Sequence, residues 1–189
     1  MEFSRKTWMS IFIAAIMILS VMGFALTFNE ENTQQLDYNG TMFTRTQNGW
    51  QAELNSQKIE FLAFPSEVED IPFDEGSKVA LDGAKVLWFT YDPGETYSQE
   101  IAEAMYYTED LLAKTDIYVQ RGLLNNTGYV LPEITCKNAT AAVPVLVIHS
   151  GNETKISHDN GCITASAENT RDVYRIADRI LFQEYKVTE

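Results

Sequence analysis

Cysteine and histidine are scarce in this 189-residue chain, which contains two of each. His149 and His158, with Glu153 and Asp159 nearby, could suggest a metal site. However, a tight turn at Gly151-Asn152 would put the two histidines about 13 Å apart, at ~3.3 Å per strand residue. Zinc requires its ligands within ~2.1 Å of one point. The sequence therefore predicts two unrelated strand histidines and no metal site.

Basic residues are also few, at 14 against 27 acidic ones, and the net charge is −13. Without Glu2, Arg5 and Lys6 near the N-terminus, the net charge becomes −14. A field of this sign repels phosphate backbones and anionic lipid headgroups, so nucleic acid is excluded as a partner. The charge suits solubility in an external or salty medium, or else docking of a basic partner. The chain contains no GxGxxG and no Gly-Lys-Ser/Thr sequence, and we predict no cofactor.

Charge is missing altogether from Trp8–Phe28. As a helix rising ~1.5 Å per residue, this segment would be about 30 Å long, the thickness of a bilayer's hydrocarbon core. Arg5 and Lys6 mark the cytoplasmic side, which predicts a single-pass anchor with the bulk of the protein outside the cytoplasm. A signal peptide cleaved after Gly23-Phe24-Ala25 is the alternative. No cysteine lies near this segment, which excludes a lipoprotein.

Both cysteines, Cys136 and Cys162, fall in the exported part. In an oxidising compartment they favour a disulfide, which would close a loop of about 25 residues and contribute roughly 3 kcal/mol. Four Asn-x-Thr sequons are glycosylation candidates if the domain is exported. Their asparagines are Asn39, Asn125, Asn138 and Asn152.

We expect four parts: a cytoplasmic tail (1–7), the anchor (8–28), a spacer with a β-meander (29–76) and an α/β domain (77–189). In the meander, strands 41–47 and 50–54 flank Asn48-Gly49, a pair typical of a type I′ hairpin turn. A third strand is expected over 58–64. Ser66 and Glu69 would then form the capping box of a short helical turn.

Beyond residue 84, consecutive apolar residues predict a central strand over 85–91. Thr96 with Gln99 would cap the next helix, and 117–123 would complete a βαβ unit. One face of that helix would carry Tyr97, Ile101, Ala104, Met105, Thr108, Leu111 and Leu112. Further strands are expected over 143–150, 154–158 and 162–167, followed by a helix capped by Asn169 or Thr170. The buried stripe of this helix would be Val173, Ile176, Ala177, Ile180 and Leu181. The aromatic residues predicted to lie in the core include Trp50, Trp88, Phe89 and Tyr118.

The element order over 85–185 resembles the thioredoxin fold, and Val143-Pro144 before a buried strand is similar to that family's cis-proline position. The resemblance implies an α/β (α+β overall) architecture in which a β-α-β-β-β-α domain follows the meander. The family's redox pair would open the first helix, where this chain reads Tyr91–Thr96 without a cysteine, so dithiol chemistry at that site is impossible. The meander pattern YNG, NGW and F-x-x-x-P-S-E is similar to uncharacterised envelope proteins of archaea, which implies no known activity.

Asp92, Glu95 and Glu100 follow the first central strand, where open α/β sheets bind ligands. With Thr96 and Pro144 they mark a possible cleft, although turn and cap roles explain the same residues. We expect no catalytic residues. The leading function is a non-catalytic, membrane-anchored accessory or interaction protein. The alternatives are a thioredoxin-like thiol-handling or chaperone factor of the envelope and a hydrolase using Asp92 and Glu95.

Overall fold

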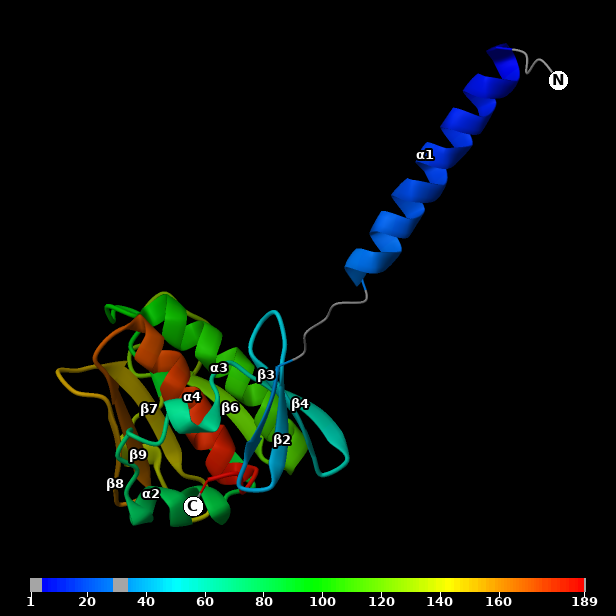
Figure 1. Ribbon diagram of the computed structural model, residues 1–189. Helices are drawn as coiled ribbons and strands as arrows, with labels where there is room; N and C mark the ends of the chain where they lie inside the picture. The colour runs from blue at the N-terminus through cyan, green and yellow to red at the C-terminus, as the bar shows by residue number, and fades with distance from the viewer. Residues whose placement is uncertain (1–4, 29–33, 189) are drawn as a thin grey trace. The chain divides into compact units, whose positions relative to one another are not determined.

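The structure, a computed structural model, describes residues 5–28 and 34–188 and divides into two units, Met1–Gln34 and Gln35–Glu189 (Figure 1). In the first unit, helix α1 spans Arg5–Phe28, and its side chains from residue 8 to residue 22 are exposed. Within the two described ranges, no helix has both the length and the apolar character needed to cross a membrane. The prediction that Trp8–Phe28 spans a membrane is therefore not supported by the helices that the structure describes.

The second unit begins with an antiparallel sheet of four strands in the order β1-β2-β3-β4. Its strands are β1 (Gln35–Tyr38), β2 (Thr41–Arg45), β3 (Trp50–Leu54) and β4 (Gln57–Phe61). Phe43, Ala52 and Ile59 lie side by side across three strands, and all three are buried. The meander is confirmed, with an additional strand, β1, ahead of the first predicted strand.

The predicted Asn-Gly pair does not have the positive φ angles of a type I′ turn, whereas another Asn-Gly pair of the meander does. Asn39 and Gly40 join β1 to β2 with φ angles of 50° and 81°. Asn48 and Gly49 do not have positive φ angles. There the Thr46 hydroxyl accepts hydrogen bonds from the backbone N–H groups of Asn48 (3.3 Å) and Gly49 (3.0 Å). The predicted hairpin is correct, but its turn is a longer loop stabilised by a side chain.

A mixed sheet of five strands, in the order β6-β5-β7-β9-β8, forms the rest of the unit. Neighbouring strands run parallel except for β8, which is antiparallel to β9. The strands are β5 (Val86–Tyr91), β6 (Tyr118–Leu123), β7 (Val145–Ser150), β8 (Lys155–Asp159) and β9 (Cys162–Ala167). The predicted strands are all present. Tyr118, predicted to be in the core, is 63 % exposed because β6 is an edge strand.

The helices of this unit are α2 (Glu75–Asp82), α3 (Ser98–Leu112) and α4 (Thr170–Glu184). Three 3₁₀ turns accompany them: η1 (Pro65–Glu67), η2 (Ala113–Thr115) and η3 (Cys136–Asn138). Helix α2 was not predicted, although Asp74 caps it by accepting a hydrogen bond from the Ser77 N–H (2.7 Å). Asn169 caps α4 as expected.

Two predicted caps are wrong. Helix α3 begins after Tyr97 without any side-chain cap, so Thr96 does not have that role. At η1, Glu67 rather than Glu69 accepts from the Phe64 N–H (2.7 Å). Glu69 instead accepts a hydrogen bond from the Tyr38 hydroxyl, which ties η1 to the meander.

Helix α4 is the centre of the core. It packs beside α3 and against β9, as Figure 1 shows, and the meander covers its other side. Phe182 contacts the ring of Phe61 with centroids 4.4 Å apart, and its ring lies 6.2 Å from that of Phe43. The apolar stripe predicted for α4 is buried, and so are Asp178 and Arg179 outside that stripe. Burial on two sides explains why polar residues of this helix are enclosed.

Candidate functional site

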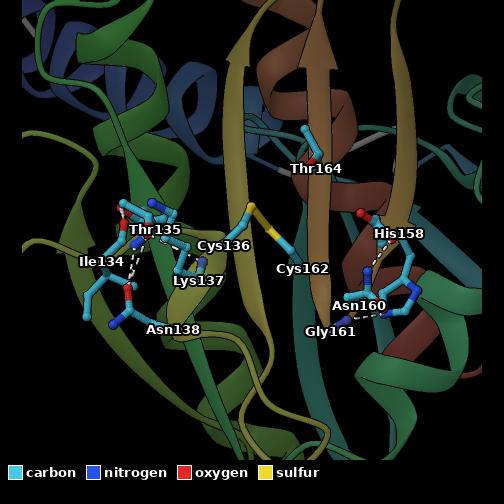
Figure 2. Close-up of a disulfide and its surroundings, with 12 residues drawn as sticks. Ile134, Thr135, Cys136, Lys137, Asn138, His158, Asn160, Gly161, Cys162 and Thr164 are labelled. Carbon is cyan, nitrogen blue, oxygen red and sulfur yellow. Dashed lines mark hydrogen bonds between the residues drawn. A yellow bond between two sulfur atoms is a disulfide. The ribbon is translucent and has the colours of Figure 1, made fainter.

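The two cysteines form a disulfide between η3 and the first residue of β9 (Figure 2). The Cys136 and Cys162 sulfurs are 2.00 Å apart, and their Cα atoms are separated by 5.2 Å, within the range of protein disulfides. The predicted pairing is therefore confirmed. Cys162 is 3 % exposed, whereas Cys136 is exposed.

The disulfide holds the later part of the segment 124–143, around Ile134 and Cys136, against the face of the sheet opposite α3 and α4. Ile134, Val145, Val147 and Cys162 form a small apolar cluster on this face, separate from the main core. The Thr90 hydroxyl donates to the carbonyl oxygen of Ile134 (3.0 Å), which adds a second attachment. A long connection that would otherwise be a free loop is thus fixed at several points.

A groove of about 690 Å³ lies beside the disulfide, between α2, the residues after η3 and the turn from β8 to β9. In Figure 2 this turn, with His158, Asn160 and Gly161, lies across from Cys162. The Gly161 N–H donates to Nε2 of His158 (2.9 Å), which orients the ring. A Cβ atom on Gly76 would lie 2.8 Å from Nδ1 of that ring, so α2 packs closely on it. Small residues give the groove an open, largely apolar floor; they are Gly76, Ala80, Ala139, Ala141 and Gly161.

The four residues of the predicted cleft do not form one site. Asp92, Glu95 and Thr96 follow the end of β5, whereas Pro144 precedes the start of β7. Because these two strands are parallel, their opposite ends lie at opposite edges of the sheet. Pro144 accepts from the Trp88 N–H (3.0 Å), and the cis bond suggested for it is absent, since the described residues have no cis peptide bond.

The acidic residues after β5 have local structural roles. Asp92 accepts from the Gly94 N–H (2.9 Å) and closes a turn. Glu95 accepts a hydrogen bond from the Ser150 hydroxyl and so joins the ends of β5 and β7. A polar hollow of about 540 Å³ lies at this edge, lined by Thr96, Tyr97, Ser150, Gly151, Asn152 and Glu168.

The histidines lie apart, as the sequence predicts. His149 pairs with Ser166 and His158 with Ile163, on opposite faces of the sheet. In the part of the chain that the structure describes, no group of three or more His, Cys, Asp or Glu side chains could hold a metal ion.

All four sequon asparagines are exposed. Asn39 lies in the turn between β1 and β2, and Asn152 follows β7. The other two belong to the disulfide-held segment, where the side-chain Oδ1 atom of Asn138 accepts from the Thr135 N–H (2.9 Å). The surface position of these side chains is compatible with the predicted glycosylation.

A buried carboxyl that the sequence did not reveal lies between α4, α3 and the meander. Asp178 is fully buried and accepts from the Tyr107 hydroxyl (2.5 Å) and the Ala63 N–H (2.6 Å). Burial raises its pKa to about 7, although these hydrogen bonds oppose the shift. Burial together with Asp178 also raises the pKa of Tyr107, so its hydroxyl stays a donor. In the sequence, the only sign of this buried carboxyl was the position of Asp178 next to the apolar stripe of α4.

Comparisons with protein-family models, with curated proteins and with solved structures find no match to this chain. The thioredoxin-like topology suggested by the element order therefore has no confirmation beyond the α+β fold itself.

Proposed function

We propose that the chain is a membrane-anchored accessory or interaction protein that presents its second unit outside the cytoplasm. The observation that carries the proposal is the Cys136–Cys162 disulfide, which fixes a long surface segment on the sheet. Structural disulfides form and persist in oxidising compartments, which supports an extracytoplasmic location. The acidic surface and the exposed sequons agree with the same location.

The anchor remains a proposal from the sequence of Trp8–Phe28 and its basic flank, Arg5 and Lys6. The large apolar side chains of α1 that the structure describes are about half to two-thirds exposed, from Ile16 at 49 % to Val21 at 69 %. Apolar side chains exposed around a helix need a covering, and a lipid bilayer is one that would accept them without specific contacts.

Interaction is favoured over thiol chemistry by the surroundings of the sulfurs. Thiolate attack needs an accessible sulfur that is stabilised by a helix N-terminus or a nearby cation. Cys162 is enclosed in the apolar cluster with Val145 and Val147, so its sulfur is not accessible. Cys136 is exposed beside Lys137, so it is the sulfur that the thiol test must examine. The segment that the disulfide holds exposes two large side chains, Tyr129 and Val130, as a contact surface would.

The location is tested by fractionation and proteolysis of the full chain in cells. We expect it to stay with membranes after a carbonate wash, and protease added outside should digest the second unit. A soluble form that begins near Leu26 would show a cleaved signal peptide and overturn the anchor.

The absence of thiol chemistry is tested with a model disulfide substrate and the purified full chain in detergent. We expect turnover no higher than the free-thiol background. Turnover above it, abolished by Cys136→Ser, would instead assign the protein to the thioredoxin-like thiol-handling alternative. Wild-type protein with both thiols blocked after reduction is the matched control.

A further inference from the structure

Exposed tyrosines gather where α3, the end of β5 and the disulfide-held segment meet. We call Tyr91, Tyr106, Tyr129 and Val130 the tyrosine surface. Tyr106 on α3 is 56 % exposed and Tyr129 is 57 % exposed, and Val130 is fully exposed. Tyr91 is half-buried, and its pKa is raised by burial and then by Tyr106 and Tyr129.

The backbone beneath this surface is fixed before any partner arrives. The Leu124 N–H donates to the Tyr91 carbonyl oxygen (2.9 Å), so the segment leaves β6 beside the end of β5. The Tyr129 N–H closes a turn on the carbonyl of Asn126 (2.9 Å). Leu123 is bridged to Glu133, and the disulfide follows three residues later. A surface held in this way loses little conformational entropy on binding.

The helix that carries Tyr106 is acidic. Along its described length, Ser98–Leu112, α3 carries four acidic residues and no basic one. Glu103 and Asp110 stand three residues before and four after Tyr106, so they share its face of the helix. This combination suits a cation that can also stack on an aromatic ring, which describes arginine better than lysine.

An arginine of the chain itself already uses these contacts. The Arg121 guanidinium lies over the ring of Tyr106, 4.8 Å from its centroid. Its Nε atom is 3.3 Å from a carboxylate oxygen of Glu109. One tyrosine and one glutamate therefore hold a guanidinium here. Tyr91 lies on the neighbouring strand β5, two residues beyond Phe89, which pairs with Arg121.

We propose that the tyrosine surface docks an arginine-bearing basic segment of a protein partner. The inference rests on the proposed function and names the chemistry of the partner. Arg121 occupies part of the surface in the free protein and acts as an internal competitor for the incoming guanidinium.

The test measures binding of labelled nona-arginine and nona-lysine peptides to the full chain in nonionic detergent at physiological salt. We expect nona-arginine to bind several-fold more tightly than nona-lysine. The double variant Tyr106→Ala with Tyr129→Ala should weaken nona-arginine binding at least about fivefold, because the loss of each cation–π contact lowers the affinity several-fold. Tyr118→Ala, at an equally exposed tyrosine of β6, should change it less than twofold.

A second pair of variants tests the competition. Arg121→Gln should tighten nona-arginine binding more than Lys155→Gln, which removes the same charge on β8 at the opposite edge of the sheet. Equal affinities for the two peptides, or equal effects of matched variants, would show attraction by net charge alone and overturn the inference. That failure would leave the anchor and thiol tests unaffected, so it is distinguishable from failure of the proposed function.

Discussion

The carboxyl group of Asp178, which has no contact with solvent, shows how one residue joins three parts of the fold. It lies on α4 and accepts hydrogen bonds from Tyr107 of α3 and from Ala63, just beyond β4. Glu184, on the same helix, is also largely enclosed, and burial raises its pKa to about 7. Each raised pKa makes the stability of the folded state depend on pH.

The direction of this dependence follows from the raised values. Between about pH 4, the unfolded pKa, and pH 7, the folded protein holds protons that the unfolded chain has released. We therefore expect the free energy of unfolding to fall as the pH rises from about 4 to 7. Each of the two carboxyl groups contributes a decrease of up to ~1.4 kcal/mol for each pH unit. The groups with lowered pKa values, Asp172 and Glu103, act with the opposite sign but only below this window.

Urea unfolding at several pH values checks this expectation. Glu184→Gln is the cleaner variant, because its buried Oε1 atom has no hydrogen-bond partner to lose. In this variant the free energy of unfolding should fall less steeply between about pH 4 and pH 7 than in the wild type. A wild-type stability that rises with pH across the window would contradict the prediction, as would an unchanged slope in the variant.

At the scale of an element, the loop between β2 and β3 depends on glycine for a reason other than backbone handedness. A Cβ atom on Gly49 would lie 1.9 Å from the Phe61 carbonyl oxygen, which is backbone and cannot move freely. Gly40 has φ of +81° but nothing within 4 Å of a Cβ. We expect Gly49→Ala to cost about 2–3 kcal/mol of stability and Gly40→Ala about 1 kcal/mol. Denaturant midpoints of the two variants decide this, and the reverse order would refute the close-approach explanation.

The attachment of the meander to α3 and α4 can be tested with two adjacent tyrosines. Tyr107→Phe removes the hydroxyl that donates to the buried Asp178, which should cost about 1–3 kcal/mol. Tyr106→Phe, one residue earlier and exposed, should change stability by less than about 0.5 kcal/mol. Unfolding free energies and hydrogen exchange of the β4 amides measure both. Equal effects would mean that the Tyr107 hydroxyl does not secure the meander.

At the scale of the whole molecule, the disulfide connects residues 26 apart and encloses β7 and β8. Replacing both cysteines by alanine should lower the free energy of unfolding by about 3 kcal/mol, chiefly because the unfolded chain gains freedom. Wild-type protein under reducing conditions is the control and should approach the same stability. A loss below about 1 kcal/mol would show that the hydrogen bonds of the segment hold it without the disulfide.

Local patterns were sufficient for the elements that depend on neighbours in the chain. The central strand predicted over 85–91 and the apolar face of α3 are both present. The cap of α4 was narrowed to Asn169 or Thr170, and Asn169 has that role. Periodicity and capping act over a few residues, which is why the sequence predicts them. Strand direction depends on contacts between distant segments, and so only the tertiary structure separated Pro144 from Asp92.

The same limit explains the residues whose environment was misread or missed. Tyr118 is exposed because β6 received no neighbour on one side, and Asp178 is buried because the meander covers the second side of α4. The sequence by itself determined the cysteine pair and the types of most elements, but not α2 or β1. The packing of the two sheets around α4 decided which polar groups are enclosed and which tyrosines reach the surface, since burial is a property of the assembled chain.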